Sequence, residues 1–160
     1  MSYKVFKKEN VKLFKSKDYN YYFDKSNGFF ARWGKNREDD PQFSPYGPEI
    51  ADIEITTICN GIGNYGPCKF CYKANDPNGT YMDITTFQKV LDKFPPTLCQ
   101  VALGADAKCE SNPDIFPIMQ HCLDNDIIPN ITVAHCENEY EKFKNQPNMD
   151  KKIIVRQKKF

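Results

Sequence analysis

The sequence lacks any apolar run long enough to span a membrane, and its N-terminus lacks the apolar core of a signal peptide. We therefore expect a cytoplasmic protein. The chain also lacks an excess of either charge, because 22 basic and 21 acidic residues leave a net charge of +1. This near-neutrality gives no global electrostatic argument for a partner, so neither a membrane nor a nucleic acid is expected to bind.

The sequence also lacks a second pair of closely spaced cysteines. Only Cys68 and Cys71, among seven cysteines, are separated by two residues, so the pattern of a zinc ribbon or finger is absent. An odd number of cysteines without an export signal favours free or metal-bound thiols over disulfides. A redox pair is disfavoured, because residues 72–79 are typical of a loop and not of the helix that follows such pairs.

The N-terminal region contains two β-prone runs, residues 19–23 and 28–33. The turn between them includes Asn27-Gly28, and both of these residue types tolerate positive φ. This combination predicts a β-hairpin.

The aromatic residues of this region are assigned to the hairpin. We interpret Phe29, Phe30 and Trp33 as its apolar core and not as a surface for stacking. The prolines and glycines between residues 34 and 48 then indicate an irregular connection. Residues 1–49 are therefore expected to form a small β-hairpin extension and a linker.

From residue 50 onward, strand and helix signals alternate. Strands are predicted over residues 50–58, 98–103 and 129–134. Helices are predicted to begin after Asp83 and Asp114, which are favoured N-cap residues. This order is typical of a parallel sheet covered by helices. Two weaker elements are predicted beyond it: a polar helix over residues 136–146 and a strand over residues 152–156.

Two unusual segments follow the first two of these strands. One is a glycine-rich loop with three cysteines, and the other is Gly104-Ala105-Asp106. Right-handed crossovers bring the carboxyl ends of parallel strands to one edge of a sheet, where ligands bind. We therefore expect the two segments to meet. Asp106 is alternatively a cap of its own turn, and Glu54 faces either a polar barrel lumen or solvent.

The three loop cysteines are Cys59, Cys68 and Cys71. Thiolates are the usual protein ligands of iron–sulfur clusters and of structural zinc. Three converging thiolates leave one iron of a four-iron cluster without a protein ligand. A zinc site needs a fourth ligand, and the chain offers several: Cys99, Cys109, His121, Cys122, His135 and Cys136. Otherwise we interpret these other cysteines as small buried apolar residues, and the histidines as packing or surface residues.

The runs Ile55-Thr56-Thr57-Ile58-Cys59-Asn60 and Cys68-Lys69-Phe70-Cys71-Tyr72 resemble the cluster loop of the radical S-adenosylmethionine (SAM) enzymes. In that family a C-x3-C-x2-C motif binds a [4Fe–4S] cluster, and SAM chelates the fourth iron. The resemblance implies that the three cysteines ligate the cluster and that the backbone of Tyr72 lies near the adenine of SAM.

Gly104, Ala105 and Asp106 stand where a Gly-Gly-Glu-Pro segment of the family contacts the amino group of SAM. The resemblance covers about residues 50–135 and suggests a subfamily from phages and uncultured microbes with an expanded cysteine loop. It implies an electron donor such as a flavodoxin or ferredoxin, and the host cytoplasm as the location if the gene is viral. The longer gap after Cys59 adds only roughly 0.7 kcal/mol of loop-closure cost, against metal–thiolate binding on the order of 10 kcal/mol.

The resemblance also implies a fold. We expect a partial (β/α) barrel with the first three or four βα units of a radical SAM core, preceded by the small β-hairpin region. Residues 50–146 are the expected partial core, and residues 147–160 a basic tail. Because the family core has six such units, we interpret the chain as truncated, split or fragmentary. A second chain that completes the barrel is one consequence.

The functional prediction is a [4Fe–4S] protein that cleaves SAM reductively to methionine and a 5′-deoxyadenosyl radical, for use on an unknown substrate. Membership of an enzyme family is predicted, whereas turnover by this chain alone is left open. Two alternatives remain: a non-catalytic zinc-binding module and an inactive remnant. No residue is assigned as a catalytic acid or base.

Overall fold

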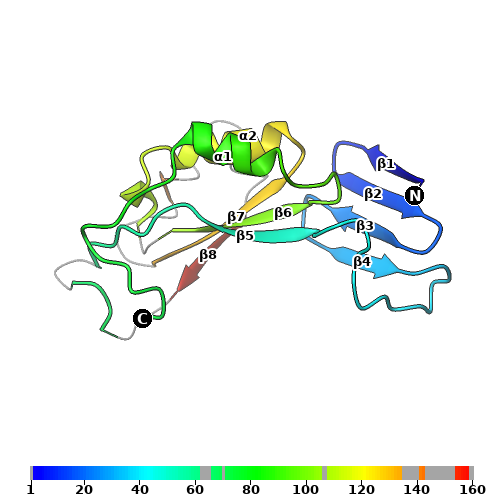
Figure 1. Cartoon of the computed structure of the whole chain (residues 1–160), viewed down its shortest axis with the longest axis horizontal. Helices are drawn as coiled ribbons and strands as arrows, with labels where there is room; N and C mark the ends of the chain where they lie inside the picture. The colour runs from blue at the N-terminus through cyan, green and yellow to red at the C-terminus, as the bar shows by residue number, and fades with distance from the viewer. Residues whose placement is uncertain are drawn as a thin grey trace. The chain divides into compact units, whose positions relative to one another are not determined.

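The computed structural model describes residues 2–61, 66–69, 71–105, 108–134, 141–142 and 154–158. The chain divides into two compact units (Figure 1). The first contains Met1–Ile50 and Phe94–Cys99, and the second contains Ala51–Lys93 and Gln100–Phe160. A short segment from the middle of the chain therefore belongs to the N-terminal unit.

The first unit is built on an antiparallel sheet of four strands in sequence order. Short turns join its strands, and connections of this length permit antiparallel pairing only. The third and fourth strands pair antiparallel, which confirms the predicted hairpin, and Gly28 in the turn between them adopts a φ of 75°. The strands are β1 (Tyr3–Lys7), β2 (Val11–Ser16), β3 (Asn20–Asp24) and β4 (Phe30–Trp33).

One face of this sheet forms the core of the first unit. Lys12 and Phe14 of β2 and Tyr21 of β3 are buried, and the rings of Phe14 and Tyr21 stack with centroids 5.5 Å apart. The Tyr21 hydroxyl donates to the carbonyl oxygen of Thr97 at 3.1 Å. The Lys12 ammonium donates to the carbonyl oxygen of Leu98. The segment from the middle of the chain thus supplies acceptors for polar atoms of this core.

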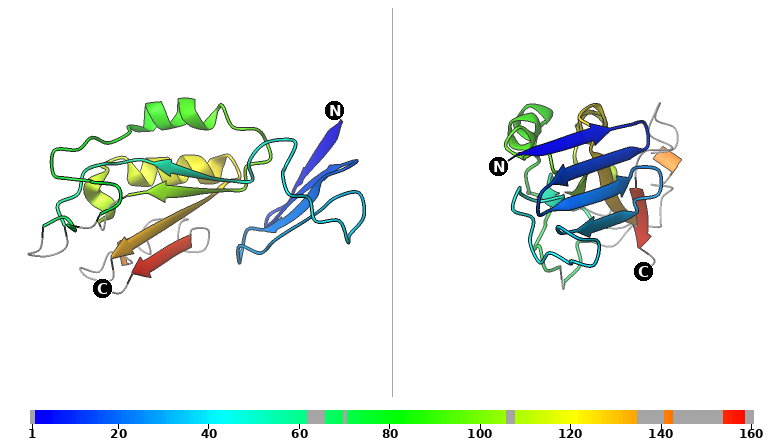
Figure 2. Two further views of the ribbon diagram at one scale, coloured as in Figure 1. Left: turned by 60° about the horizontal axis from the view of Figure 1, so that its bottom comes forward. Right: turned by 90° about the vertical axis from the view of Figure 1, so that its right-hand side faces the viewer.

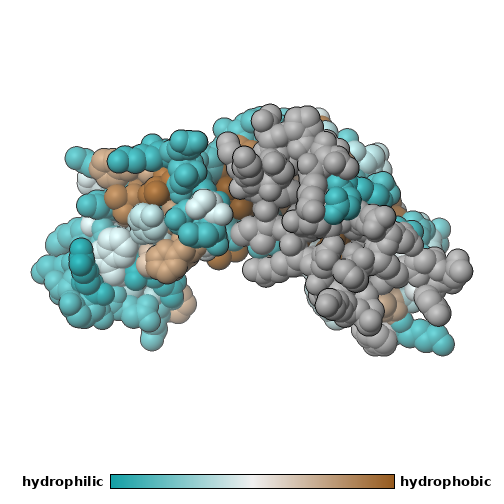
Figure 3. All heavy atoms as spheres, turned by 180° about the vertical axis from the view of Figure 1, so that it is seen from behind, coloured by the Kyte–Doolittle hydropathy of each residue, from teal (hydrophilic) through white to brown (hydrophobic). Residues whose placement is uncertain are grey.

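The opposite face of the sheet carries lysines and partly exposed aromatic residues. In the right view of Figure 2, no ribbon of this unit passes in front of the four strands. Figure 3 shows the molecule from behind, a different side from that view, and apolar side chains of the first unit reach the surface there between hydrophilic ones. Six residues on this side define what we call the lysine–aromatic face: Lys4, Phe6, Lys15, Tyr22, Phe29 and Trp33.

The interpretation of Phe29, Phe30 and Trp33 as one hairpin core is wrong. Phe30 lies on the core face, where its ring centroid is 5.5 Å from that of Tyr21. Phe29 is 58% exposed, and Trp33 is half-buried on the other face. The cause is the two-residue repeat of a strand, which directs neighbouring side chains to opposite faces.

The second unit contains a sheet with the strand order β5–β6–β7–β8, in which β6, β7 and β8 pair in parallel. Both of its helices lie over the same face of this sheet (Figure 2, left). Helix α2 contacts both α1 and β7. The elements are β5 (Ile50–Glu54), α1 (Ile84–Leu91), β6 (Gln100–Gly104), the 3-10 turn η1 (Cys109–Ser111), α2 (Ile115–Asp124), β7 (Ile128–Ala134) and β8 (Ile154–Lys158).

Both helices begin where the sequence predicts. Asp83 caps α1, because its carboxylate accepts a hydrogen bond from the N–H of Thr86 at 2.6 Å. Asp114 precedes α2 but makes no side-chain cap there. Its carboxylate instead accepts from the N–H of Ile84 at 2.9 Å, in the first turn of α1. Asp114 therefore ties the starts of the two helices together.

The predicted partial (β/α) barrel is wrong. The described residues form two sheets and two short helices that are described from end to end, Ile84–Leu91 and Ile115–Asp124, so the fold is mostly β. Neither helix is long and apolar enough to cross a membrane. The prediction missed β1 and β2, whose frequent lysines weaken the strand signal. A region expected to hold one hairpin therefore forms a complete antiparallel sheet.

The last predicted elements are described only in part. Residues 141–142 are helical, within the helix predicted over residues 136–146. Strand β8 overlaps the strand predicted over residues 152–156. The other residues of these two predictions lie outside the described residues.

Candidate functional site

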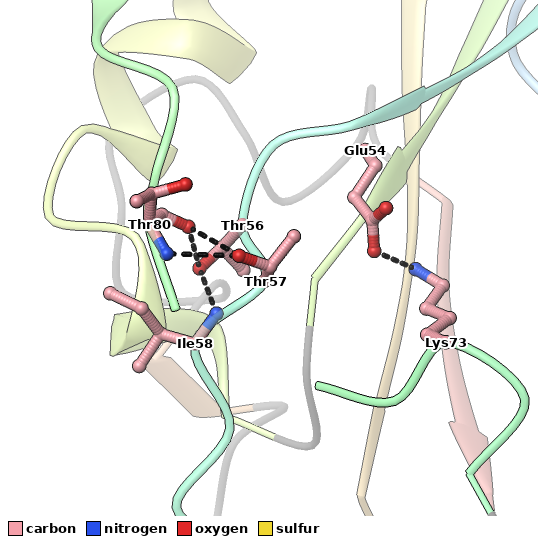
Figure 4. A network of polar contacts seen from close by, with 6 residues as sticks. All are labelled: Glu54, Thr56, Thr57, Ile58, Lys73 and Thr80. Atoms are coloured by element: carbon pink, nitrogen blue, oxygen red, sulfur yellow. Dashed lines mark hydrogen bonds and ion pairs between the residues drawn. The ribbon is translucent and has the colours of Figure 1, made fainter. Parts of the chain in front are cut away.

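The cysteine loop begins and ends at a short neck in which the chain pairs with itself. The N–H of Thr57 donates to the carbonyl oxygen of Thr80 at 2.8 Å, and the N–H of Thr80 donates to the Thr57 hydroxyl at 2.9 Å (Figure 4). The Thr56 hydroxyl also accepts from the N–H of Ile58 at 3.1 Å. These bonds hold the two ends of the loop beside each other, directly after β5.

Gly79 allows the two arms of the neck to approach closely. A β-carbon at this position would lie 2.3 Å from the carbonyl oxygen of Thr57. Real β-carbons do not approach other atoms so closely, so the neck requires a residue without one.

Cys59 follows the neck in the sequence and is half-buried. Its N–H donates to the carbonyl oxygen of Asp76 at 2.9 Å, and Ile58 forms an isolated β-bridge with Asp76. The first cysteine is thus positioned by backbone pairing at the neck. Gly61 follows with a φ of 78°, a left-handed conformation that suits glycine.

Cys68 and Cys71 share one turn, in which the N–H of Cys71 donates to the carbonyl oxygen of Cys68 at 3.0 Å. The chain then folds back on the second sulfur, and Ala74 takes a φ of 51°. Backbone N–H groups of Asn75 and then Lys73 lower the pKa of Cys71 below its usual value by bonding to its thiolate. The positive charge of Lys73 adds a smaller effect in the same direction. The turn therefore favours a thiolate at Cys71.

Lys73 connects this turn to the edge of the sheet. Its Nζ lies 3.0 Å from Oε1 of Glu54, the last residue of β5 (Figure 4). The carbonyl oxygen of Gly104, at the end of β6, accepts from the N–H of Ile55 at 2.9 Å. A β-carbon on Gly104 would lie 3.0 Å from the Lys73 Nζ. Glycine at this position therefore leaves room for the lysine beside the ends of both strands.

These contacts place Lys73, which follows the cysteine turn, beside Gly104 at the end of β6. Ala105 is half-buried directly after β6, and Asp106 lies outside the described residues. Tyr72 is 90% exposed beside Cys71. Glu54 pairs with Lys73 at the sheet edge, so neither of its two expected environments, a barrel lumen or solvent alone, describes it fully.

The described residues contain no group of three His, Cys, Asp or Glu side chains close enough to hold a metal ion. Cys59, Cys68 and Cys71 therefore share a loop without being gathered at one point. The chemistry of this donor set does fit a thiophilic metal, because all three remain thiols outside any disulfide. One of the three also lies where its thiolate is stabilised.

The sequence reasoning missed two residues that organise the site, Lys73 and Asn112. The Asn112 side chain is fully buried, and its Nδ2 donates to the carbonyl oxygens of Ile55 at 2.7 Å and Met82 at 3.0 Å. It therefore holds both sides of the neck from a position just before α2. The position of Lys73, two residues after Cys71, could have indicated a role at the cysteine turn. No local sequence pattern indicates the contacts of Asn112.

The remaining cysteines and histidines are consistent with packing roles where they are described. Cys99 and Cys122 are buried, and burial raises the pKa of Cys122 to about 12. The ring of His121 packs edge-on against Phe87, with centroids 6.5 Å apart. Three members of the set lie outside what the structure describes: the side chain of Cys109, and the residues His135 and Cys136.

Comparison of the chain with protein-family models, curated proteins and solved structures finds no match. The resemblance of the cysteine loop to radical SAM enzymes therefore stays a prediction.

Proposed function

We propose that the chain is a protein of the radical SAM type that binds a [4Fe–4S] cluster through Cys59, Cys68 and Cys71. Two observations support this proposal: the three cysteines lie outside any disulfide on one loop directly after β5, and backbone N–H groups of Asn75 and Lys73 lower the pKa of Cys71. Cluster ligands are thiolates, so a turn that favours the thiolate lowers the cost of binding.

Binding also requires Cys59 to approach the turn that carries Cys68 and Cys71. Cys59 is held at the neck, and residues 60–67 separate it from the turn of Cys68 and Cys71. Glycines stand at both ends of that segment, Gly61 and Gly66, and a β-carbon on Gly66 would meet no atom within 4 Å. Loop closure around a metal costs little compared with the thiolate bonds that it forms.

The edge of the sheet beside this loop is the proposed binding place for SAM. Gly104 lies there beside the Lys73 ammonium, Ala105 and Asp106 follow it in the sequence, and Tyr72 follows Cys71 directly. When bound, the cluster supplies the electron that cleaves SAM to methionine and a 5′-deoxyadenosyl radical. A flavodoxin or ferredoxin in the cytoplasm is the proposed source of that electron.

Anaerobic reconstitution with iron and sulfide tests the proposal. We expect about four iron and four sulfide per chain, a brown protein, and loss of the cluster in each of Cys59→Ala, Cys68→Ala and Cys71→Ala. Cys99→Ala is the matched control, since it removes a thiol outside the loop and leaves the cluster intact. Addition of SAM and a strong reductant should then release 5′-deoxyadenosine.

Two results contradict the proposal. In the first, a full cluster still assembles in Cys71→Ala. In the second, one zinc ion per chain saturates the three cysteines and prevents reconstitution, which identifies a zinc module instead. A cluster that forms without any cleavage of SAM retains the cofactor assignment and identifies an inactive remnant.

A further inference from the structure

The lysine–aromatic face of the first unit differs from the core face of the same sheet in its exposure. On the core face, Phe14 and Tyr21 are fully buried. On the lysine–aromatic face, Phe6 is 47% exposed and Phe29 is 58% exposed. Large apolar side chains gathered on an open surface are unusual for a domain that has no partner there.

The aromatic rings of this face are spread over three of the four strands or their ends. Phe6 on β1 and Tyr22 on β3 lie in one cross-strand row, with Leu13 between them. Strand spacing sets the two rings about 10 Å apart. Phe29 extends the row, with its ring centroid 6.3 Å from that of Tyr22. Trp33 on β4 is the only tryptophan of the chain.

The strand positions of this face carry two lysines and one aspartate. Lys4 and Lys15 are exposed and directly opposite each other across β1 and β2. Like charges in this arrangement destabilise a sheet in the absence of an anionic partner. Asp24 is the one acidic residue at a strand position on this side, and its carboxylate accepts hydrogen bonds from Ser26 and Asn27 in the adjacent turn.

We propose that the lysine–aromatic face binds single-stranded nucleic acid. Bases stack on Phe6, Tyr22 and Trp33, since every base presents a π-face to an aromatic ring. Phosphates lie beside Lys4 and Lys15, where they relieve the repulsion between the two ammonium groups.

A second copy of the chain is a less favourable occupant. A two-fold contact whose axis passes near the Lys4–Lys15 pair brings the pairs of both copies together, so four positive charges face one another. An anionic membrane would neutralise the charges of Lys4 and Lys15, but its binding would not depend on the spacing between the aromatic rings. Both alternatives give distinct results in the experiment.

The test uses the whole chain and a single-stranded oligothymidylate. Stacking on Trp33 is expected to quench its fluorescence, and the anisotropy of a labelled oligonucleotide is expected to rise. Phe6→Ala should weaken binding roughly five- to 150-fold. Lys4→Ala combined with Lys15→Ala should lower the slope of log K against log salt by about 1.4. Phe6 is partly exposed on an edge strand, so its truncation leaves the core intact.

Matched controls use residues of the same types away from the face. Phe43→Ala removes a ring that is 80% exposed in the connection after β4, and Lys89→Ala removes a charge on α1; neither should change binding. The proposal fails if the oligonucleotide leaves the Trp33 emission and the anisotropy unchanged, or if Phe6→Ala binds like the original chain. It also fails if only anionic vesicles alter Trp33, or if sedimentation shows a dimer that Phe6→Ala dissociates.

Discussion

At the scale of single residues, the neck of the cysteine loop depends on the absence of one β-carbon. Gly79→Ala would place that atom 2.3 Å from the Thr57 carbonyl oxygen and force the two arms apart. We expect a loss of about 1–3 kcal/mol in the free energy of unfolding, measured by urea denaturation. Hydrogen exchange should also show faster exchange of the Thr57 and Thr80 amides.

Gly66→Ala is the control for this change. It lies in the same loop, and a β-carbon there meets no atom within 4 Å. Its stability is expected to stay within about 0.5 kcal/mol of the original. Equal losses in the two variants would mean that the contact with Thr57 does not set the cost.

A second prediction at this scale concerns the pH dependence of cysteine reactivity. The thiolate is the reactive form, and the pKa of Cys71 is lowered whereas that of Cys122 is raised to about 12. Iodoacetamide at neutral pH should therefore modify Cys71 long before Cys122. The rate at Cys71 should rise with pH and level off at a lower pH than for an ordinary thiol, as peptide mass spectrometry can measure.

The chain unfolded in urea provides the reference for this measurement. There Cys71 loses the N–H groups of Asn75 and Lys73, so its profile should move to higher pH. An identical profile in folded and unfolded chains would show that the turn does not stabilise the thiolate. It would also remove the main support for a cluster at this loop.

At the scale of elements, Asn112 joins β5, the segment before α1 and the start of α2. Asn112→Asp keeps the shape of the side chain but removes the Nδ2 donor, so the carbonyl oxygens of Ile55 and Met82 lose their bonds. We expect a loss of about 2–4 kcal/mol in the free energy of unfolding. Asn125→Asp makes the same chemical change at an exposed donor to the His121 carbonyl and should cost below about 1 kcal/mol. Similar losses at both positions would contradict the role of Asn112.

The sequence predicts those elements of the fold whose signals are local. The Asp83 cap, the turn at Gly28 and the three strands from residue 50 follow from short patterns, and the structure contains each of them. Lys12 is buried at a position where a strand usually has an apolar residue, so the alternating pattern of β2 is not visible in the sequence. The predicted architecture contained too few strands for this reason, because β1 and β2, half of the first sheet, carry no clear local strand signal.

The residues of the candidate site likewise divide into those that local sequence patterns predict and those that they do not. Cysteine spacing marks Cys59, Cys68 and Cys71 directly, and strand order predicts that their loop meets Gly104. Asn112 was out of reach, because its partners are backbone carbonyls 57 and 30 residues away in the sequence. Contacts of this kind depend on how elements pack, so composition and periodicity cannot predict them.

At the scale of the whole molecule, the first unit is discontinuous in sequence, which gives a prediction about fragments. A chain of residues 1–50 lacks Thr97 and Leu98, whose carbonyl oxygens accept from the Tyr21 hydroxyl and the Lys12 ammonium. Lys12 is only 2% exposed, and a buried ammonium that loses an acceptor is strongly destabilising. Residues 1–50 alone should therefore lack the near-ultraviolet circular dichroism of packed aromatic rings.

A fragment of residues 1–99 retains both acceptors and is the matched comparison. We expect it to recover the aromatic signal and a cooperative thermal transition, because the segment Phe94–Cys99 belongs to the first unit. If residues 1–50 fold as well as residues 1–99, the sheet is stable without these bonds. Lys12 would then have to reach solvent or another acceptor once the segment is removed. Amide exchange at Lys12 and Phe14 distinguishes these cases, because a sheet that has rearranged to expose the lysine protects these amides less than the intact unit does.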